Sequence, residues 1–258
     1  MLSGIDLKQL FLFPIKDAES RRYFFIGCVV ALAGFIIPVV PYLALFGYVA
    51  RIAKQVFNNE EPRMIPWDDW GGMIKDGLMM FGVRLVYSLP ILVLSIPFIC
   101  MGLSMPVIME NVNSSEVEST IAIISLAMTA FVCILVPLAL PLAVIIPAAE
   151  MYAVDKNEFA AGMKFREWWA IFRANLGGFI AAFAIYYVVS MALTFAVQIL
   201  FITIILACLV PILLPALTNY AVLIMYTTIA QAYQAGRQKL AQAGLNPAQD
   251  SPPPSPQT

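Results

Sequence analysis

The 60 residues from Leu176 to Ala235 contain no charged side chain. As one α-helix this stretch would be about 90 Å long, which is about three times the thickness of the hydrocarbon core of a bilayer. It must therefore turn back at least once, and we expect the turn near residues 198–204. The stretch predicts two apolar helices that cross a membrane in opposite directions.

The rest of the chain has the same character. Hydrophobic residues make up 61% of it and charged residues 12%, whereas a soluble domain carries about 25% charged residues. We therefore predict an all-α fold, a polytopic integral membrane helical bundle that occupies residues 23–236. The five predicted membrane segments are 23–50, 77–105, 119–149, 176–199 and 204–235.

Residues outside this membrane domain differ in kind. Residues 1–22 alternate apolar side chains with Lys8, Lys16 and Asp17, a pattern typical of a segment that lies on the membrane surface. Residues 246–258 are rich in proline and polar side chains, and we expect them to be disordered.

The distribution of basic residues predicts the orientation. The loops at 51–76 and 150–175 and the chain after Ala235 carry lysine and arginine, whereas the acidic loop at 110–118 carries none. Basic residues in short loops remain cytoplasmic, so we expect both basic loops and the C-terminus inside the cell membrane.

The N-terminus conflicts with five plain crossings, because it is basic and yet would lie outside. A break of the first segment at Pro38–Pro41, with the chain returning as a re-entrant pair or tight hairpin, would resolve the conflict. It would give six membrane segments and a cytoplasmic N-terminus. Both alternatives remain open from the sequence.

An internal repeat links the two basic loops. Trp70, Asp76 and Tyr87 recur 99 positions later as a second triplet, and each triplet lies where a polar loop runs into an apolar segment. The second triplet is Trp169, Asn175 and Tyr186. A second repetition, Val-Pro-x-x-Leu-Pro, occurs at 136–141 and at 210–215.

Each basic loop is predicted to hold a short interfacial helix. In the first loop Trp67 and Trp70 share a helical face, and Asp68 and Asp69 follow Pro66 as carboxylates do in a first helical turn. The alternative is that the two aspartates form a cation or substrate site. Neighbouring residues point to different faces of a helix, which favours capping. We expect each helix to turn into the next segment at its glycines, Gly71, Gly72 and Gly77 or Gly177 and Gly178.

A few polar residues fall inside the apolar segments. Arg84 is a candidate ion-pair partner of Glu150, with Asp76 two turns before it. Asn219 and Tyr226 form one polar stripe, Ser190, Thr194 and Gln198 a second, and Tyr220, Thr227 and Gln231 a third. Helix packing explains such stripes most simply, and a narrow polar path through the bundle is the alternative.

Several classes of function lack support in the sequence. The chain has no histidine, no Ser/His/Asp set, no glycine-rich phosphate loop and no metal-ligand spacing, so we expect no catalytic residues, no cofactor, no metal and no enzymatic activity. The net charge of −1 gives no case for nucleic acid. The four cysteines lie in apolar runs without a CxxC pair and are expected to act as small hydrophobic side chains.

The first half of the chain resembles a bacterial and archaeal membrane-protein family known as domain of unknown function 4013. The resemblance is carried by Gly47-Tyr48-Val49-Ala50-Arg51, Pro66-Trp67-Asp68-Asp69-Trp70, Asp76-Gly77 and Tyr87-Ser88-Leu89-Pro90. It would cover about 20–235. In that family leucine-proline often precedes the tryptophan, where this chain has Ile65-Pro66. The resemblance implies a polytopic membrane protein and no particular activity.

Two functions remain open at this stage. The first is a structural, assembly or accessory membrane module whose partners are the lipid bilayer and other membrane proteins or a second copy of itself. The second is a small-solute or ion transporter or channel-like module, with Arg84, Glu150 and the polar stripes along its path. Internal repeats and broken helices suit transporters.

Overall fold

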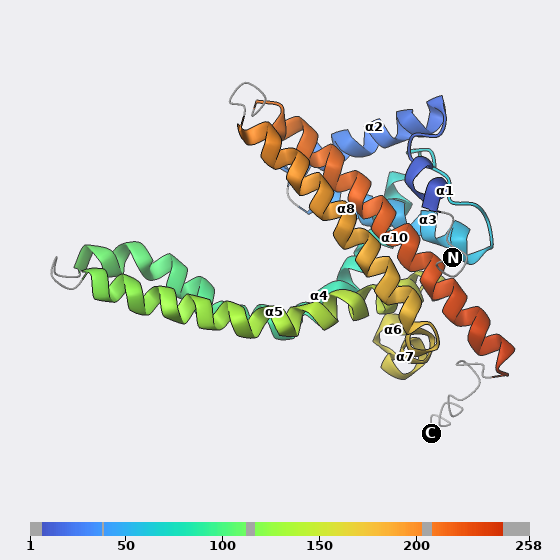
Figure 1. Ribbon diagram of the computed structural model, residues 1–258. Coiled ribbons are helices and arrows are strands. Elements are labelled where there is room, and N and C mark those ends of the chain that lie inside the picture. Colours follow the sequence, from blue (N-terminus) through green and yellow to red (C-terminus); the bar gives the residue numbers. More distant parts are fainter. Residues whose placement is uncertain (1–6, 38, 112–116, 203–207, 245–258) are drawn as a thin grey trace. The chain divides into compact units, whose positions relative to one another are not determined.

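The computed structural model describes residues 7–37, 39–111, 117–202 and 208–244 (Figure 1). Within these residues all regular structure is helical, as the sequence predicts. The helices are α1 (Leu7–Leu12), α2 (Ala18–Ala33), α3 (Val40–Phe57), α4 (Trp70–Asn111), α5 (Val117–Lys156), α6 (Phe159–Met163), α7 (Phe165–Ala174), α8 (Leu176–Ile202) and α10 (Val210–Gln242).

The chain divides into two compact units. The first unit combines both ends of the chain, Met1–Val83 and Pro147–Thr258, and the second is Arg84–Ile146. The start of α4, up to Val83, and the end of α5, from Pro147, belong to the first unit. The remaining turns of both helices make up the second unit. Each unit is described by itself below.

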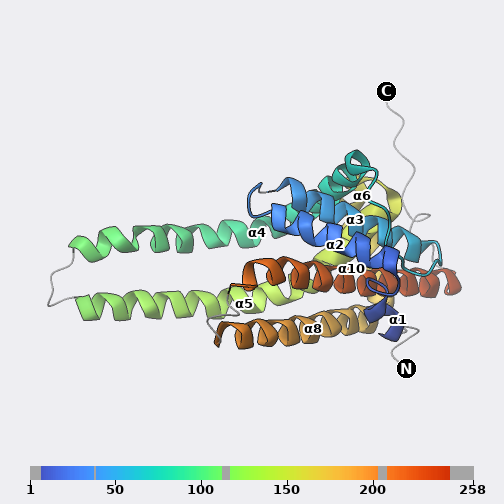
Figure 2. The same ribbon diagram turned by 90° about the horizontal axis from the view of Figure 1, so that it is seen from above.

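Helix α10 is the central helix of the first unit. It contacts α1, α2, α3, α7 and α8, and it lies alongside α8 in both views of the ribbon (Figures 1 and 2). Half of its most apolar window is buried, compared with 11% for α8. The charge-free stretch from Leu176 to Ala235 therefore contains two neighbouring helices, as expected. Of the expected turn at 198–204, residues 198–202 still belong to α8, and 203–204 lie outside the described residues.

The first apolar run, 23–50, is not one continuous helix. It is divided between α2 and α3, which pack against each other. Two features separate them: Pro41 occupies the first turn of α3, and Val39 before it has a φ of 79°, which a β-branched residue rarely adopts. Of the two alternatives that the sequence leaves open, one continuous helix over 23–50 is therefore excluded, whereas the re-entrant course through a membrane stays a prediction. Pro38 itself lies outside the described residues.

Helices α3 and α4 cross with their backbones in contact. A Cβ atom on Gly47 would lie 1.7 Å from the carbonyl oxygen of Met73, and one on Gly77 would lie 1.8 Å from that of Leu43. Only glycine, which lacks a Cβ, permits so close an approach. This crossing fixes α3 against the first turns of α4.

The second unit is a pair of helical segments, residues 84–111 of α4 and 117–146 of α5. Phe98 and Phe131 stack across the pair with ring centroids 4.7 Å apart. Most of its large apolar side chains are exposed, including Leu103 at 76% and Leu126 at 72%. Both helices continue through their internal prolines. The two Val-Pro-x-x-Leu-Pro runs have different positions, because the run at 136–141 lies inside α5 and the run at 210–215 forms the start of α10.

Four of the described helices are long and apolar enough to cross a membrane, which makes the chain a multi-pass membrane protein. These are Trp70–Ile108, Val117–Lys156, Leu176–Ile199 and Val210–Gln242. They contain the second to fourth predicted segments and residues 210–235 of the fifth. Most of the 110–118 loop and the whole 246–258 tail lie outside the described residues.

Candidate functional site

Charged and polar side chains of the first unit gather where several helices begin or end. We call this region the polar end. Its members come from the end of α3, the start of α4, the end of α5, α7 and the last turns of α10. They are Arg51, Lys54, Asp69, Asp76, Asp155, Asn157, Glu167, Asn175, Arg237 and Lys239.

The first group at the polar end joins α3 to the start of α4. The Arg51 guanidinium lies 2.6 Å from Asp69 Oδ2 and 3.3 Å from Asp76 Oδ2. Lys54 Nζ lies 3.4 Å from Asp76 and donates to Asn157 Oδ1 at 3.0 Å. Two basic residues of α3 therefore neutralise two carboxylates of the next segment and reach the chain after α5.

Asp69 has two donors. Besides Arg51, the backbone N–H of Gly72 donates to Asp69 Oδ1 at 3.0 Å, so the carboxylate caps α4. The hydrogen bond from Arg51, followed by that from Gly72, holds the pKa of Asp69 below its ordinary value. Burial alone would lower the pKa of Arg51, but its bonds to Asp69 and Asp76 raise it. The neighbouring Asp68 is exposed and belongs to none of the ion pairs described at the polar end.

The second group joins α5 to α10. Asp155 accepts a hydrogen bond from Arg237 at 2.7 Å and one from the Tyr233 hydroxyl at 3.1 Å. Nearby, the Tyr152 hydroxyl donates to Glu167 of α7. Nothing local in the sequence marks Asp155 and Tyr233, because the partners of Asp155 lie 78 and 82 residues away along the chain. Glu167 is only 15 residues from Tyr152, but no motif in the sequence marks it either.

Glu150, a candidate from the sequence, is completely buried in the first unit. Its Oε2 accepts a hydrogen bond from the Tyr226 hydroxyl at 2.8 Å. Arg84, its proposed ion-pair partner, is the first residue of the second unit and is half-buried. The pairing of Arg84 with Glu150 therefore stays a prediction, whereas the α5–α10 link through Tyr226 is observed.

The repeated positions Asp76 and Asn175 both meet a lysine from the end of another helix. Asn175 accepts from Lys239 Nζ at 2.6 Å and donates to the Ala232 carbonyl at 2.8 Å. Their local settings differ, because Asp76 lies inside α4 and Asn175 separates α7 from α8. The internal repeat therefore stays a prediction.

The aromatic residues of the first loop do not form a separate helix. Helix α4 begins at Trp70, which is 42% exposed, and continues without a break through Gly71, Gly72 and Gly77. Trp67 lies before it and is buried: its ring stacks on Tyr48 at 4.2 Å, and its Nε1 donates to the Tyr23 carbonyl at 3.0 Å. The prediction of a separate short helix here is wrong, because residues 58–69 form no helix. Whether Trp70 lies in a membrane interface stays a prediction.

The second loop does contain a separate helix, α7. Phe165, Trp169 and Phe172 stack in sequence along one face, with centroid distances of 5.2 Å at both steps. Trp168 is fully buried and Trp169 half-buried. The chain turns into α8 at Asn175, two residues before the expected Gly177. Whether α7 lies in a membrane interface stays a prediction.

The predicted polar stripes have different surroundings. Asn219 is buried against α2, with its Nδ2 3.9 Å from Cys28 Sγ and tightly packed on Gly27. Thr194 and Gln198 are exposed, and the Thr194 hydroxyl bonds the Ser190 carbonyl within α8. Ser190 and Thr194 also line a groove between α8 and α10, so a polar path along this stripe stays a prediction.

The third stripe includes two polar atoms that lack partners. The Thr227 hydroxyl and the side-chain amide oxygen of Gln231 are buried without a hydrogen bond among the described residues. Both belong to α10, one turn apart. An unpaired buried polar group lowers stability by about 1–3 kcal/mol, so this pair is a weak point of the core.

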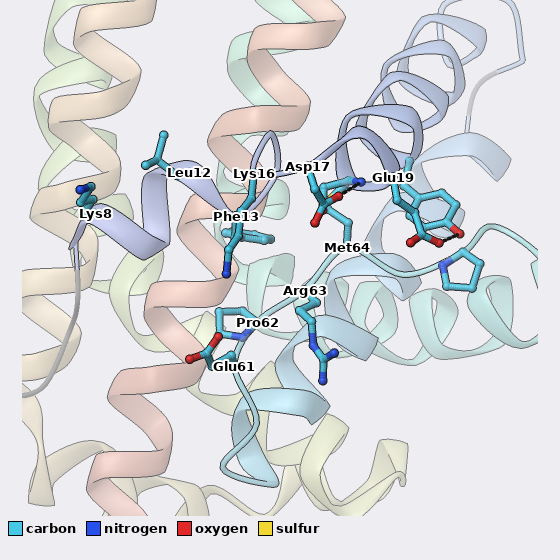
Figure 3. Close-up of a pocket in the computed structure, with 13 residues that line it drawn as sticks. Lys8, Leu12, Phe13, Lys16, Asp17, Glu19, Glu61, Pro62, Arg63 and Met64 are labelled. Carbon is cyan, nitrogen blue, oxygen red and sulfur yellow. Dashed lines mark hydrogen bonds between the residues drawn. The ribbon is translucent and has the colours of Figure 1, made fainter.

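A cavity of about 490 Å³ opens beside α1 (Figure 3). Its walls are α1, the first turns of α2 and the segment 61–66 after α3. Lys8 and Lys16 stand on one side of it, and Glu61 and Arg63 on the other (Figure 3). The sequence marked the N-terminal lysines as part of an amphipathic segment but gave no sign that residues 61–66 face them.

The chemistry available at the polar end is that of ion pairing and helix fastening. Its described carboxylates accept hydrogen bonds from arginine, lysine or tyrosine side chains. Among the described residues, no three histidine, cysteine or acidic side chains converge as metal ligands would. Partly exposed ion pairs of this kind stabilise by about 0–1 kcal/mol each, so their contribution depends on their number.

Comparison with known proteins identifies a family and no activity. The model of a family described as protein of unknown function (DUF4013) matches residues 30–202, which is more than half of the chain. The matched region contains α3 to α8 and ends before α10. Comparisons with curated proteins and with solved structures gave no match. The chain therefore belongs to the DUF4013 family of proteins of unknown function.

Proposed function

We propose that this protein is a structural, assembly or accessory module of the cell membrane, and that it catalyses no reaction. The observation that carries the proposal is the exposed apolar surface of the second unit. In the most apolar window of α4 no residue is buried, and in that of α5 only 6% are. This surface is available to lipid and to the apolar helices of a partner.

The first unit supports the same role through its charges. The described ion pairs at the polar end join α3 to α4 and α5 to α10, so these side chains fasten helices to one another. A reactive site needs groups that are held ready for a substrate. The charged side chains of the polar end already bind each other, which suits a structural role better than a catalytic one.

Four crossings together with a re-entrant α2–α3 pair would give the chain six membrane segments. The pair has charged residues at its open end and apolar ones at its tip, where Phe35 is 63% and Ile36 83% exposed. In this arrangement the N-terminus, both basic loops and the end of α10 share the cytoplasmic side, in agreement with the positive-inside rule.

Photo-crosslinking in native membranes tests the accessory role. Cys100 and Cys133 are exposed on the second unit, so variants that keep only one of them can carry a photoreactive label there. We expect one discrete protein adduct, with another protein or with a second copy, at both positions. A variant that keeps only Cys28, which is half-buried in the first unit, is the control. Adducts with lipid alone would contradict the proposal.

Liposome flux tests the transporter alternative. A solute flux that depends on the protein and is lost in Arg84→Leu and Glu150→Gln would replace the accessory role with transport. We expect no such flux.

A further inference from the structure

The cavity beside α1 has the size and composition of a ligand site. Its volume of about 490 Å³ lies within the range of about 300–1,000 Å³ that is common for small-molecule pockets. Its walls come from segments that are distant in the chain, α1 and the 61–66 segment. It lies at the open, charged end of the α2–α3 pair.

The charges around the cavity are mixed. Three cationic side chains line it, Lys8, Lys16 and Arg63, together with three carboxylates, Asp17, Glu19 and Glu61. Two of the carboxylates have roles within α2. Asp17 caps the helix by accepting from the Ser20 N–H at 2.7 Å, and Glu19 accepts from the Tyr23 hydroxyl at 2.6 Å.

Glu61 stands on the wall opposite α2. It is exposed and lies next to Pro62 and Arg63 in the 61–66 segment (Figure 3). Lys16 extends from the α1–α2 junction toward this wall (Figure 3). The cavity therefore offers cationic groups and a carboxylate to one ligand, which suits a ligand that carries both a negative and a positive charge.

Apolar side chains complete the cavity. Leu12, Phe13 and Met64 line it, and Leu12 and the nearby Ile15 are 43% and 45% exposed. Lysines beside exposed apolar side chains on a short amphipathic segment are typical of the boundary between head groups and acyl chains. A ligand with a charged head and apolar chains fits this setting better than a fully soluble one.

We propose that the cavity binds the head group of a zwitterionic phospholipid, with its phosphodiester against Lys16 and Arg63 and its ammonium against Glu61. The acyl chains would leave the cavity past Leu12 and Ile15. Charge-assisted hydrogen bonds to phosphate give the binding its strength, and the carboxylate gives it a preference for an amine. The proposal rests on the re-entrant position of α2 and α3, which brings the cavity to the membrane surface.

Native mass spectrometry of the full chain, purified in detergent, tests the site with three probes: dioleoyl phosphatidylethanolamine, dioleoyl phosphatidylglycerol and soluble glycerophosphoethanolamine. We expect phosphatidylethanolamine to bind best. Lys16→Gln and Arg63→Gln should each weaken it about tenfold, which corresponds to one charge-assisted contact. Arg22→Gln is the matched control, because Arg22 is exposed on α2 outside the cavity.

Glu61→Gln gives a signature that unfolding cannot imitate. It should remove the preference for phosphatidylethanolamine while binding of phosphatidylglycerol is kept or improved. Equal weakening by Arg22→Gln would indicate general surface charge and overturn the proposal. Competition by glycerophosphoethanolamine at the same concentration would indicate a soluble ligand instead of a lipid, and would also overturn it.

Labelling distinguishes a failure of the site from a failure of the topology. Ala18→Cys, in a background without other cysteines, introduces an exposed thiol at the start of α2. A membrane-impermeant maleimide added from outside should not reach it. Labelling from outside would overturn the re-entrant arrangement, whereas protection with no lipid preference would overturn the binding site alone.

Discussion

The Tyr48 hydroxyl forms two hydrogen bonds with the backbone of Ile65. It donates to the Ile65 carbonyl at 2.9 Å and accepts from the Ile65 N–H at 3.0 Å. Tyr48 is 1% exposed and belongs to α3, whereas Ile65 lies in the segment that leads to α4. One side chain therefore satisfies both polar groups of a residue that forms no helix.

Tyr48→Phe should destabilise the first unit by about 1–3 kcal/mol, because it leaves both backbone groups of Ile65 without their partner. The free energy of unfolding in detergent measures the effect. Tyr187→Phe removes a hydroxyl from a side chain that is 55% exposed, and it should cost almost nothing. Equal stability of the two variants would mean that water replaces the Tyr48 hydroxyl.

Gly47→Ala should be among the most destabilising single substitutions. The added Cβ would lie 1.7 Å from the Met73 carbonyl oxygen, which is backbone and cannot turn away, so α3 and α4 must separate. Overpacking of this kind costs about 1–3 kcal/mol and sometimes more. Thermal unfolding measures it against Gly71→Ala, where the added Cβ meets nothing within 4 Å. If Gly47→Ala unfolded at the same temperature as the wild-type protein, the close approach of α3 and α4 at this position would be contradicted.

The adjacent Thr227 and Thr228 should respond in opposite directions to valine. Thr228 donates to the Ile224 carbonyl at 2.8 Å, whereas the Thr227 hydroxyl is buried without a described partner. Thr227→Val removes an unpaired polar group and should stabilise by about 1 kcal/mol, and Thr228→Val should destabilise by a similar amount. Denaturant unfolding of both variants checks the sign. A loss of stability in Thr227→Val would show that its hydroxyl has a partner after all.

Asp69 should make the stability of the first unit depend on acid pH. Its pKa in the folded protein is lowered from 3.8 by the hydrogen bonds from Arg51 and the Gly72 N–H. Its contribution is therefore complete above pH 3.8 and is lost as the pH falls through the lower, folded-state pKa. Asp69→Asn should flatten the fall of the unfolding free energy in this window, whereas Asp68→Asn, with the same change of charge, should keep it. An unchanged slope in Asp69→Asn would exclude this role.

The helices and their apolar character could be predicted from the sequence, because both follow from local composition. A stretch without charge from Leu176 to Ala235 has few other solutions in a membrane. The division of 23–50 was harder to predict. The same Pro38–Pro41 run suits a kinked single span or two helices, and the outcome depends on the packing of α2 and α3 on α10.

The surroundings of individual side chains could not be predicted, because they depend on distant partners. Trp67 has the spacing of an interfacial tryptophan, yet Tyr48, 19 residues earlier, covers its ring. The partners of Asp155 lie on α10, and those of Asn175 do too. The cavity beside α1 likewise requires Lys16 and Arg63, which are 47 positions apart, to line the same space.

The central position of α10 has a consequence for biosynthesis. The first unit combines two stretches that are far apart in the chain, and its core helix α10 follows the whole second unit in the sequence. Helices α1 to α3 are therefore made before α10. The faces that pack on α10 stay uncovered while the second unit and α8 are synthesised. Domains whose sequence is continuous can fold while synthesis proceeds. Here α1 to α3 can complete their packing only after Val210–Gln242 has been made, so the faces that it covers stay open for longer during synthesis than those of a domain with a continuous sequence.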